Sequence, residues 1–398
     1  MTTAPAIPRS TVLCLGFSQL IGWGITYYLI GGFGQAIGAD LGWSRDVVYG
    51  GFSAGLGVMA LTSPLTGRLI DRHGGRWVMV LGSALSALGC LGIALSQGIA
   101  SYYAAWICLG FAMRFSLYDA AFASLARLGG PAAKGPISQI TLLGGLASTV
   151  FWPIGSALAV WLGWRGAVAC YAGFALLTIP LHLAIPPARP ADMTGRAPAP
   201  SSRPLATTPI DRAIAGTLYA LIATLTNILN SAMSAHMIGI LGGLGIAGGA
   251  AVWIATLRGV GQSLARGAEV LFGRRFDPLK LNLGAAIVLP LCFVAGLASG
   301  VSAAAALGFA FFYGAANGIT TITRGTLPLV LFETSRYGEI VGKLLIPSFI
   351  LQAGAPVLYA AAIDAFGAAS ALWISIGLAS LTFLAALGLV LRFSPRRI

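Results

Sequence analysis

The sequence predicts an all-α membrane protein with twelve transmembrane helices in two six-helix bundles, and three observations lead to this fold class. Hydrophobic residues make up 57% of the 398-residue chain and charged residues only 9%, whereas a soluble globular domain is about a quarter charged. The apolar residues gather into runs of about 20 or more, the length of a helix that crosses a bilayer. A stretch rich in Pro, Ala, Ser and Thr divides these runs into two sets of six.

The individual elements follow from counting about 20 apolar residues per crossing. The first six spans are expected at about residues 11–38, 46–67, 76–97, 101–127, 136–162 and 166–186, and the second six at about 211–241, 250–273, 280–299, 302–326, 338–363 and 367–392. We therefore expect an N-terminal bundle over residues 1–186 and a C-terminal bundle over residues 211–398. Residues 187–210 are expected to form a cytoplasmic linker, because their composition cannot bury enough apolar surface to fold alone.

The basic residues predict the orientation of the chain. If the chain starts inside, the outward loops hold only Arg45 and Arg165, while Arg114, Arg258 and Arg324 fall within spans. The other basic residues lie at inward ends, in inward loops and at the termini, which the positive-inside rule places in the cytoplasm. We expect a multi-pass protein of the cytoplasmic (inner) membrane with both termini cytoplasmic. The net charge of +13 then reflects membrane topology and not nucleic-acid binding.

Several function classes are disfavoured by what the sequence lacks. The five cysteines lie inside apolar runs without ligand-like spacing, so neither a disulfide framework nor a zinc site is expected. The sequence has no phosphate-binding loop, no HExxH pair and no serine-hydrolase motif. We therefore expect no metal and no cofactor, and neither an enzyme nor an ATP-driven pump.

The stretch from residue 67 to residue 77 combines charges and glycines between two apolar runs. About ten residues must reverse the chain there at the membrane surface, so a tight, glycine-assisted hairpin is expected. Its acidic residue can meet exposed amides at helix N-termini, and its arginines can pair with carboxylates or lipid phosphates. We interpret the stretch as a conformational latch formed by Gly67, Asp71, Arg72, Gly74 and Arg76. The alternative is an ordinary positively charged inside loop, which explains neither the acid nor the glycine spacing.

The pattern G-x-x-x-D-R-x-G-x-R over this stretch resembles the signature loop between the second and third spans of the major facilitator superfamily. The resemblance implies a carrier that works by alternating access between two six-helix halves around a midplane site. Arg266, Glu269, Gly273 and Arg274 repeat the Arg, acid, Gly and Arg of the loop at one constant offset. This repeat adds Arg266 and Glu269 to the latch, although such matches also arise by chance in a basic loop.

Two further motifs resemble one branch of this superfamily. Gly163-Trp164-Arg165 and Gly42-Trp43-Ser44-Arg45 are similar to motifs of the monocarboxylate porter and oxalate:formate antiporter branch. Where that branch carries an Asp-Gly-Gly-Trp-Gly-Trp stretch in the first span, this sequence has only Ile21-Gly22-Trp23-Gly24. The identity of the substrate therefore does not carry over.

Arg258 is the leading candidate for a substrate-binding residue. It lies about eight residues into the eighth span, near mid-bilayer at about 1.5 Å per residue, and ionisable residues at such depth are functional candidates by default. Members of the monocarboxylate and oxalate branch place an arginine in this span to bind the substrate carboxylate, and Arg258 is the one residue here that matches it. The alternative is a structural partner for a buried carboxylate or for helix-end carbonyls.

Three other charged residues lie within spans. Arg114 is in the middle of the fourth span, where proton-coupled antiporters of the superfamily carry an arginine. Asp119, five residues on and about 140° around a regular helix, is not expected to pair with it. Asp119 is interpreted either as a proton-carrying site or as a salt-bridge partner of a neighbouring span. Arg324, nearer the cytoplasmic end of the tenth span, is a gate, a substrate ligand or a snorkelling residue.

Polar and aromatic stripes predict a wet cavity. The first span carries Gln19, Trp23 and Tyr27 on one face, and the tenth carries Tyr313, Asn317 and Thr321. Such stripes usually belong to a core, but in a bilayer a polar face has to meet protein or water, and the first, fourth, seventh and tenth spans line the path in the resembling fold. His236 in the seventh span is either a proton relay or a satisfied structural histidine.

These observations predict a secondary active transporter. Three arginines against one aspartate within the spans favour a small organic anion, monocarboxylate-like, moved with protons or by exchange. The alternatives are a proton-driven exporter of amphipathic drugs or metabolites, and a receptor that binds ligand without flux. The expected partners are the substrate and the lipid bilayer, with no nucleic acid, and a monomer is expected. The predicted substrate-binding residues are Arg258, Arg114, Arg324, Gln19, Trp23, Tyr27, Asn317 and Tyr313, and the proton-coupling candidates are Asp119 and His236.

Overall fold

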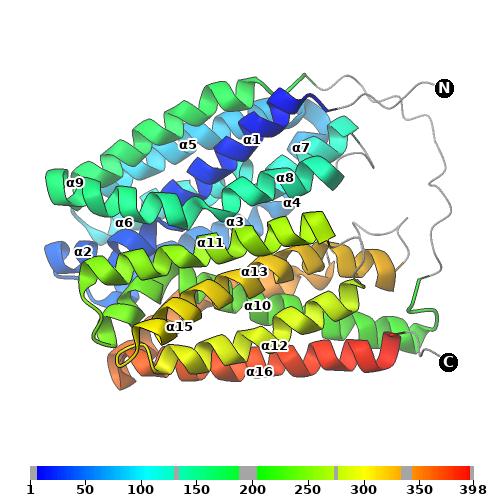
Figure 1. The fold of residues 1–398 in the computed structure, drawn as a ribbon. Coiled ribbons are helices and arrows are strands. Elements are labelled where there is room, and N and C mark those ends of the chain that lie inside the picture. The colour runs from blue at the N-terminus through cyan, green and yellow to red at the C-terminus, as the bar shows by residue number, and fades with distance from the viewer. Residues whose placement is uncertain (1–6, 130–133, 188–203, 273–276, 333–342, 395–398) are drawn as a thin grey trace.

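The computed structural model describes residues 7–129, 134–187, 204–272, 277–332 and 343–394. This part of the chain is built almost entirely of helices and contains no β-strand. Figure 1 shows the helices of the first half packed above those of the second, with their long axes running in broadly the same direction. The all-helical fold in two bundles is therefore confirmed.

Helices in the first half account for each of its six predicted spans. They are α1 (Arg9–Gly22), the π-helix η1 (Trp23–Tyr27), α2 (Leu29–Leu41), α3 (Arg45–Leu61), α4 (Ser63–His73), α5 (Gly75–Leu95), α6 (Ile99–Ser116), α7 (Tyr118–Gly129), α8 (Lys134–Gly145) and α9 (Ala147–Leu183). The first, second, fourth and fifth spans are each broken within the membrane part. Helix α9 holds the end of the fifth span and all of the sixth, because Gly163 turns the chain with a φ of 68°, a conformation that glycine adopts without a Cβ penalty.

The second half is more regular. Its helices are α10 (Pro209–Gly243), α11 (Gly248–Phe272), α12 (Pro278–Leu297), α13 (Ala303–Leu331), α15 (Ile346–Phe366) and α16 (Ala368–Phe393). Each coincides with one predicted span, although the first residues of the eleventh, 338–342, lie outside the described part. Pro328 in α13 lacks an N–H and leaves the Arg324 carbonyl without its helical donor. The Tyr219 hydroxyl of α10 donates to that carbonyl at 2.9 Å, so the two helices are joined there.

Length, composition and surface aromatics agree with a membrane protein. Eight uninterrupted stretches of the described chain are long and apolar enough to cross a bilayer by those measures alone, and one of them, Gly135–Leu183, contains two crossings. Trp161, Trp253 and Trp373 are exposed near the turns at one end of the bundle, and Trp77 is exposed at the other. Tryptophan concentrates where a membrane meets water. The molecule is a multi-pass membrane protein.

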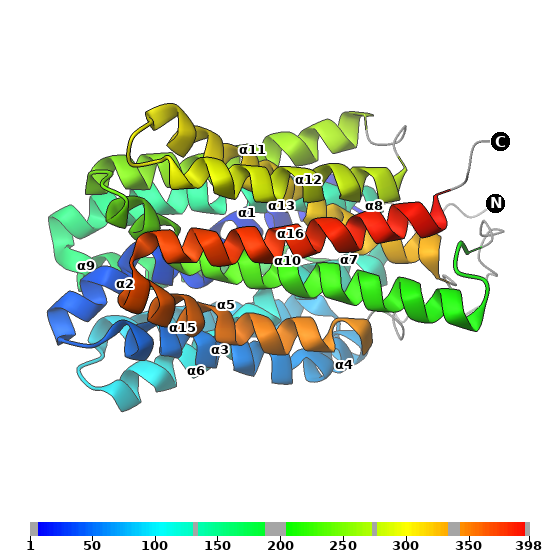
Figure 2. The ribbon, with the colours of Figure 1, turned by 90° about the horizontal axis from the view of Figure 1, so that it is seen from below.

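The two halves contact each other at the end of the bundle opposite the start of α1 and the end of α16, which lies at the left in Figure 1 and in Figure 2. Helix α10 packs on α2 and α15 on α3. A Cβ atom on Gly31 of α2 would lie 2.2 Å from the Ser234 carbonyl of α10, so glycine is required for this approach. Arg45 and Asp364 form a salt bridge of 2.9 Å across the same end. The halves are therefore closed against each other there.

The predicted linker, residues 187–210, is described only at its two ends. The backbone amides of Leu205 and Ala206 donate to the carbonyls of Val330 and Leu331 at 3.0 and 3.1 Å. Ala206 is buried. The last part of the predicted linker is thus tied to the end of α13 by backbone hydrogen bonds, which do not depend on apolar side chains.

Candidate substrate-binding site

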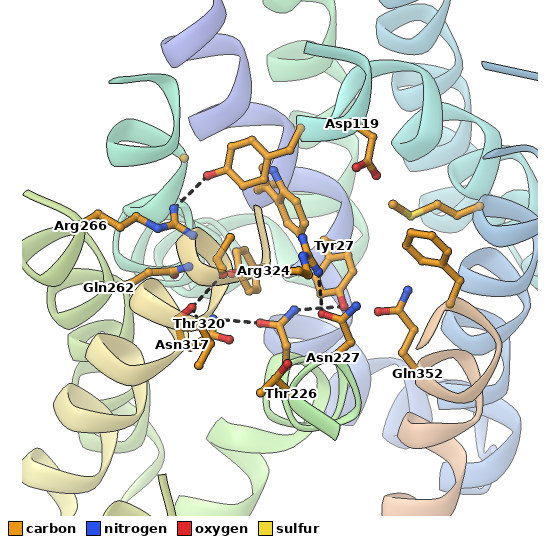
Figure 3. A pocket seen from close by; sticks show the side chains of 18 residues that line it. Tyr27, Asp119, Thr226, Asn227, Gln262, Arg266, Asn317, Thr320, Arg324 and Gln352 are labelled. Carbon is orange, nitrogen blue, oxygen red and sulfur yellow. Dashed lines mark hydrogen bonds between the residues drawn. The ribbon is translucent and has the colours of Figure 1, made fainter. Parts of the chain in front are cut away.

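A cavity of about 830 Å³, open space at its mouth included, lies between the two halves. The first half supplies Trp23, Tyr27, Tyr28, Met59, Tyr118, Asp119 and Gly144 to its lining, and the second supplies Thr226, Asn227, Asn230, Gln262, Arg266, Asn317, Thr320, Thr321, Arg324, Phe349 and Gln352. Figure 3 shows these side chains converging from helices on both sides. Parts of the first, second, fourth and fifth spans thus face parts of the seventh, eighth, tenth and eleventh.

The two sides of the cavity differ in chemistry. We call Trp23, Tyr27, Tyr28 and Tyr118 the aromatic wall, and Asn227, Asn230, Gln262, Arg266, Asn317 and Arg324 the polar wall. The aromatic wall belongs entirely to the first half and the polar wall entirely to the second. Any movement of one half relative to the other therefore changes the distance between an apolar surface and a cationic one.

Amide side chains of α10 organise the polar wall. Asn227 Oδ1 accepts a hydrogen bond of 2.8 Å from Arg324 Nη1. Asn230 Oδ1 accepts two, from Arg258 Nη2 at 2.7 Å and from Asn317 Nδ2 at 3.2 Å. Three helices that are far apart in the sequence, α10, α11 and α13, are joined by these bonds. The amides fix Arg258 and Arg324 in place and, being neutral, do not compensate their positive charge.

Arg258 lies directly behind this wall and is absent from the cavity lining. Its side chain is fully buried, with the guanidinium carbon 5.3 Å from the Tyr28 ring and 5.2 Å from the Tyr313 ring. Such cation–π contacts partly replace the lost hydration of the charge. Nε and Nη1 have no hydrogen-bond partner, and no carboxylate lies within 4.0 Å of the guanidinium, among the residues that the structure describes.

Arg266, which the sequence repeat adds to the predicted latch, lies in the polar wall. It is buried, and its Nη1 donates to the Thr141 carbonyl at 2.5 Å and to the Tyr118 hydroxyl at 3.3 Å, both in the first half. Its Nε is buried without a partner in the described part of the chain. Figure 3 shows Arg266 at the edge of the cavity beside Gln262. Glu269, one turn further along α11, is only partly buried and does not line the cavity.

Arg114 and Asp119 form a salt bridge of 2.5 Å, so the expectation that they do not pair is wrong. That expectation assumed one regular helix, whereas α6 ends at Ser116 and α7 starts at Tyr118, with Leu117 extended between them. The break removes the 100° per residue rotation on which the expectation was based. Arg114 also donates to Ser63 Oγ. Asp119 lines the cavity, and its charge is balanced within its own span.

The aromatic stripe of the first span is centred on η1. Trp23 and Tyr27 line the cavity as the sequence predicts, and Tyr28 joins them. Gln19, predicted on the same face, is buried outside the lining and donates from Nε2 to the Ser116 carbonyl at 2.8 Å. It therefore holds the first span against the end of α6.

Tyr313 and His236 lie outside the cavity lining. Tyr313 is buried, and its hydroxyl donates to the Leu229 carbonyl at 3.1 Å. His236 is buried as well, and Nε2 donates to the Pro356 carbonyl at 2.7 Å while its ring lies 4.0 Å from that of Tyr49. Of the other residues predicted for substrate binding, Asn317 and Arg324 line the cavity.

The predicted latch loop is described in part. Gly74 separates α4 from α5 with a φ of 79°, as a glycine-assisted turn requires. Gly67 is part of α4, and Arg76 donates from Nε to the Ile185 carbonyl at 2.5 Å, which ties the turn to the end of the sixth span. The side chains of Asp71 and Arg72 lie outside the described residues.

Sequence reasoning missed several lining residues. Gln262, Gln352, Thr226 and Tyr118 are isolated polar or aromatic residues in apolar runs, and a single such residue carries no periodic signal. The position of Asn230 between two arginine-bearing helices, α11 and α13, could not be read from the sequence.

Comparison with known proteins identifies the family. A family model described as "Major Facilitator Superfamily" matches residues 12–344. No curated protein sequence matches the chain. The fold is similar to that of a D-xylose-proton symporter (TM-score 0.74, 16% identity, 97% of this chain and 98% of that one). It is also similar to the nucleoside transporter NupG (0.72, 14%, 96% and 99%) and to a bacterial homolog of the human lysosomal transporter Spinster (0.68, 13%, 96% of both).

Identities of this size show a shared fold and do not extend to substrate. The family model, in contrast, spans most of the chain, and the two-bundle architecture agrees with it. The chain belongs to the major facilitator superfamily of membrane transporters.

Proposed function

We propose that this transporter moves a small organic anion of the monocarboxylate type across the cytoplasmic membrane, coupled to protons or by exchange, with both termini in the cytoplasm. One observation carries the proposal. Arg258, Arg266 and Arg324 lie in or directly behind the polar wall, and in the described chain their hydrogen-bond partners are amides, a phenol and a carbonyl. None of these partners is negative.

The charge balance of the cavity supports an anionic substrate. Asp119 is the carboxylate in the lining, and Arg114 already neutralises it. Among the residues that the structure describes, the three remaining arginines leave the site strongly positive, and burial of an uncompensated charge is costly. A bound anion would offset that cost and would find guanidinium groups suited to two parallel hydrogen bonds with a carboxylate.

Buried donors without partners also support anion binding. Arg258 Nε and Nη1 and Arg266 Nε are buried and have no partner in the described residues. Buried polar groups in native proteins are nearly always hydrogen-bonded to protein, water or ligand. Arg266 lines the cavity, so substrate or water can complete its bonding there. Arg258 acts on a substrate through Asn230, which it polarises and positions.

Proton coupling is assigned to the Arg114–Asp119 pair. Asp119 lines the cavity, and its side chain is 41% exposed, so a proton can reach it from the same space as the substrate. Protonation would release Arg114 and add one positive charge to the cavity. The proton and the anion would then favour each other's binding, as linkage requires.

A second candidate function, export of amphipathic drugs or metabolites, is favoured by the aromatic wall. The aromatic rings of Trp23, Tyr27 and Tyr118 line the cavity, as a site for a compound with a hydrophobic body requires. This function requires no negative charge on the substrate. The response of binding to the loss of an arginine therefore separates the two candidates.

The test uses purified protein and matched pairs of carboxylates and their neutral amides. Anion binding should raise the melting temperature of the wild type, and the amides should not. Arg266→Gln should weaken carboxylate binding by at least about tenfold, the effect of one charge-assisted hydrogen bond. Arg9→Gln is the control, since Arg9 is exposed at the start of α1. Equal binding of amide and carboxylate, unaffected by Arg266→Gln, would favour the exporter.

A further inference from the structure

The π-helical turn η1 brings three aromatic side chains to one wall. The Tyr28 amide donates to the Trp23 carbonyl, five residues back, at 3.0 Å. A π-helical turn takes up nearly one residue more than an α-helical turn. In a regular α-helix, five residues would turn Tyr28 about 140° away from Trp23. The wider π-turn reduces this angle, so that Tyr28 joins Tyr27 on the side of Trp23. All three line the cavity.

The rings form one continuous aromatic cluster; Tyr27 and Tyr28 are buried in it, and the partly exposed Trp23 and Tyr118 form most of its surface toward the cavity. The Trp23 ring centroid lies 4.9 Å from that of Tyr27, 5.0 Å from that of Tyr118 and 6.2 Å from that of Tyr28. These separations fall within the range of favourable aromatic pairs. Tyr118 comes from the fourth span, so the surface also joins two elements of the first half.

The backbone under this surface is fixed in place. A Cβ atom on Gly24 would lie 2.3 Å from the Phe151 ring of α9, so η1 is in close contact with its neighbour through a glycine. Cys90 of α5 donates from Sγ to the Ile25 carbonyl at 3.5 Å. The π-turn is thus held from two sides, which preserves the orientation of the rings. π-Turns in helices occur frequently at functional sites.

We infer that the substrate is an aryl carboxylate: its carboxylate binds the polar wall of the second half, and its planar ring lies against Trp23, Tyr27 and Tyr118. This inference rests on the anion transport proposed above and adds the chemical class of the group that is attached to the carboxylate. A planar ring matches a wall of ring faces and edges better than a saturated ring of similar size, because offset and edge-to-face pairing adds to area burial.

The division of the walls has a consequence for transport. An aryl carboxylate contacts both halves at once, whereas a short carboxylate such as acetate can satisfy the polar wall alone. A ligand shifts a conformational equilibrium only by its differential affinity for the two states. Short carboxylates should therefore bind weakly and support little exchange, and aryl carboxylates should support both.

The experiment compares three probes of equal charge: benzoate, cyclohexanecarboxylate and acetate. Calorimetric affinities are measured for the wild type, for Trp23→Leu and for the control Trp161→Leu, whose tryptophan is 86% exposed on α9. The wild type and Trp161→Leu should bind benzoate about tenfold more tightly than cyclohexanecarboxylate. Trp23→Leu should remove that preference and leave acetate affinity unchanged, and Trp23→Phe should retain most of the preference.

Equal affinity of the wild type for benzoate and cyclohexanecarboxylate would overturn the inference, as would a preference that survives in Trp23→Leu. If Trp23→Leu does not fold, the wild-type comparison and Trp23→Phe decide the matter. Neutral benzamide distinguishes the two levels of the proposal. Tight binding of benzamide together with benzoate would refute anion selectivity but not ring recognition, whereas equal binding of all three carboxylates, without benzamide, would refute ring recognition alone.

Discussion

Replacement of Arg258 by methionine should reduce anion affinity, and it should destabilise the substrate-free protein less than the loss of one partner of a buried ion pair would. Arg258 is fully buried and donates to Asn230 at 2.7 Å, with two aromatic rings beside it. Methionine keeps much of the volume and removes the charge. The two effects separate because the described structure gives this guanidinium no carboxylate partner.

The expected change in stability is the difference between two free energies: the cost of burying the Arg258 charge, and the gain from its hydrogen bond and cation–π contacts. Burial of an ion costs several kcal/mol in a real protein. A hydrogen bond to a charged group returns about 1.5–3 kcal/mol, and each of the two cation–π contacts returns about 0.5–2 kcal/mol. These terms nearly cancel, so the free energy of unfolding should change by no more than about 2 kcal/mol. A buried ion pair would instead lose about 3–5 kcal/mol.

The affinity estimate follows from the position of Arg258 behind Asn230. An anion bonded to the polar wall would lie roughly 7 Å from the guanidinium, and at an effective dielectric constant of about 20 the attraction is about 2 kcal/mol. This corresponds to a loss of about thirtyfold in affinity. Asn230→Asp should cause a similar loss, because it neutralises Arg258 without removing it.

The assay is the melting temperature of purified Arg258→Met and Asn230→Asp proteins, without and with a carboxylate series. Full anion affinity in Arg258→Met would refute the electrostatic role of Arg258. A loss of stability as large as that of a broken ion pair would instead show that the arginine is a structural partner of a carboxylate.

Three further predictions concern the latch, proton coupling and packing. Asp71→Asn should shift the conformational equilibrium by about 1–3 kcal/mol and should therefore slow flux more than it weakens equilibrium binding; equal losses of flux and binding would contradict this. Asp119→Asn should retain anion exchange in proteoliposomes but lose accumulation driven by a proton gradient, and retained accumulation would remove Asp119 from coupling. Gly314→Ala should cost about 1–3 kcal/mol of stability, since its Cβ would overlap a backbone carbonyl of α11, whereas Gly308→Ala on the same helix meets open space and should not destabilise in a melting assay.

The sequence predicted the spans well because their signal is local. Each of the twelve expected stretches coincides with helix in the described chain, since about 20 apolar residues in a row have few alternatives in a bilayer. The breaks within spans were not predicted. Leu117 separates α6 from α7 although neither proline nor glycine stands at residues 115–119, so tertiary packing determines this break.

The candidate site could be predicted only where its residues follow a helical period. Trp23 and Tyr27 were found by their spacing, and Asn317 by its position in a polar stripe. Arg266 was placed in a loop, because a motif repeat was given more weight than its depth in the eighth span. Arg258 was expected in contact with substrate, yet Asn230 lies between it and the cavity. Which of two buried arginines reaches a cavity depends on neighbouring helices, and a single sequence does not contain that information.

The break at Leu117 links the curvature of the fourth span to the charge of the cavity. Arg114 and Asp119 meet only because the chain bends between them; in a straight helix they would point about 140° apart. Any rearrangement that straightens this span would therefore separate the two charges and expose both to whatever fills the cavity. The fourth span would then act as a charge switch operated by bending, and the electrostatic field felt by the cargo would vary through the transport cycle.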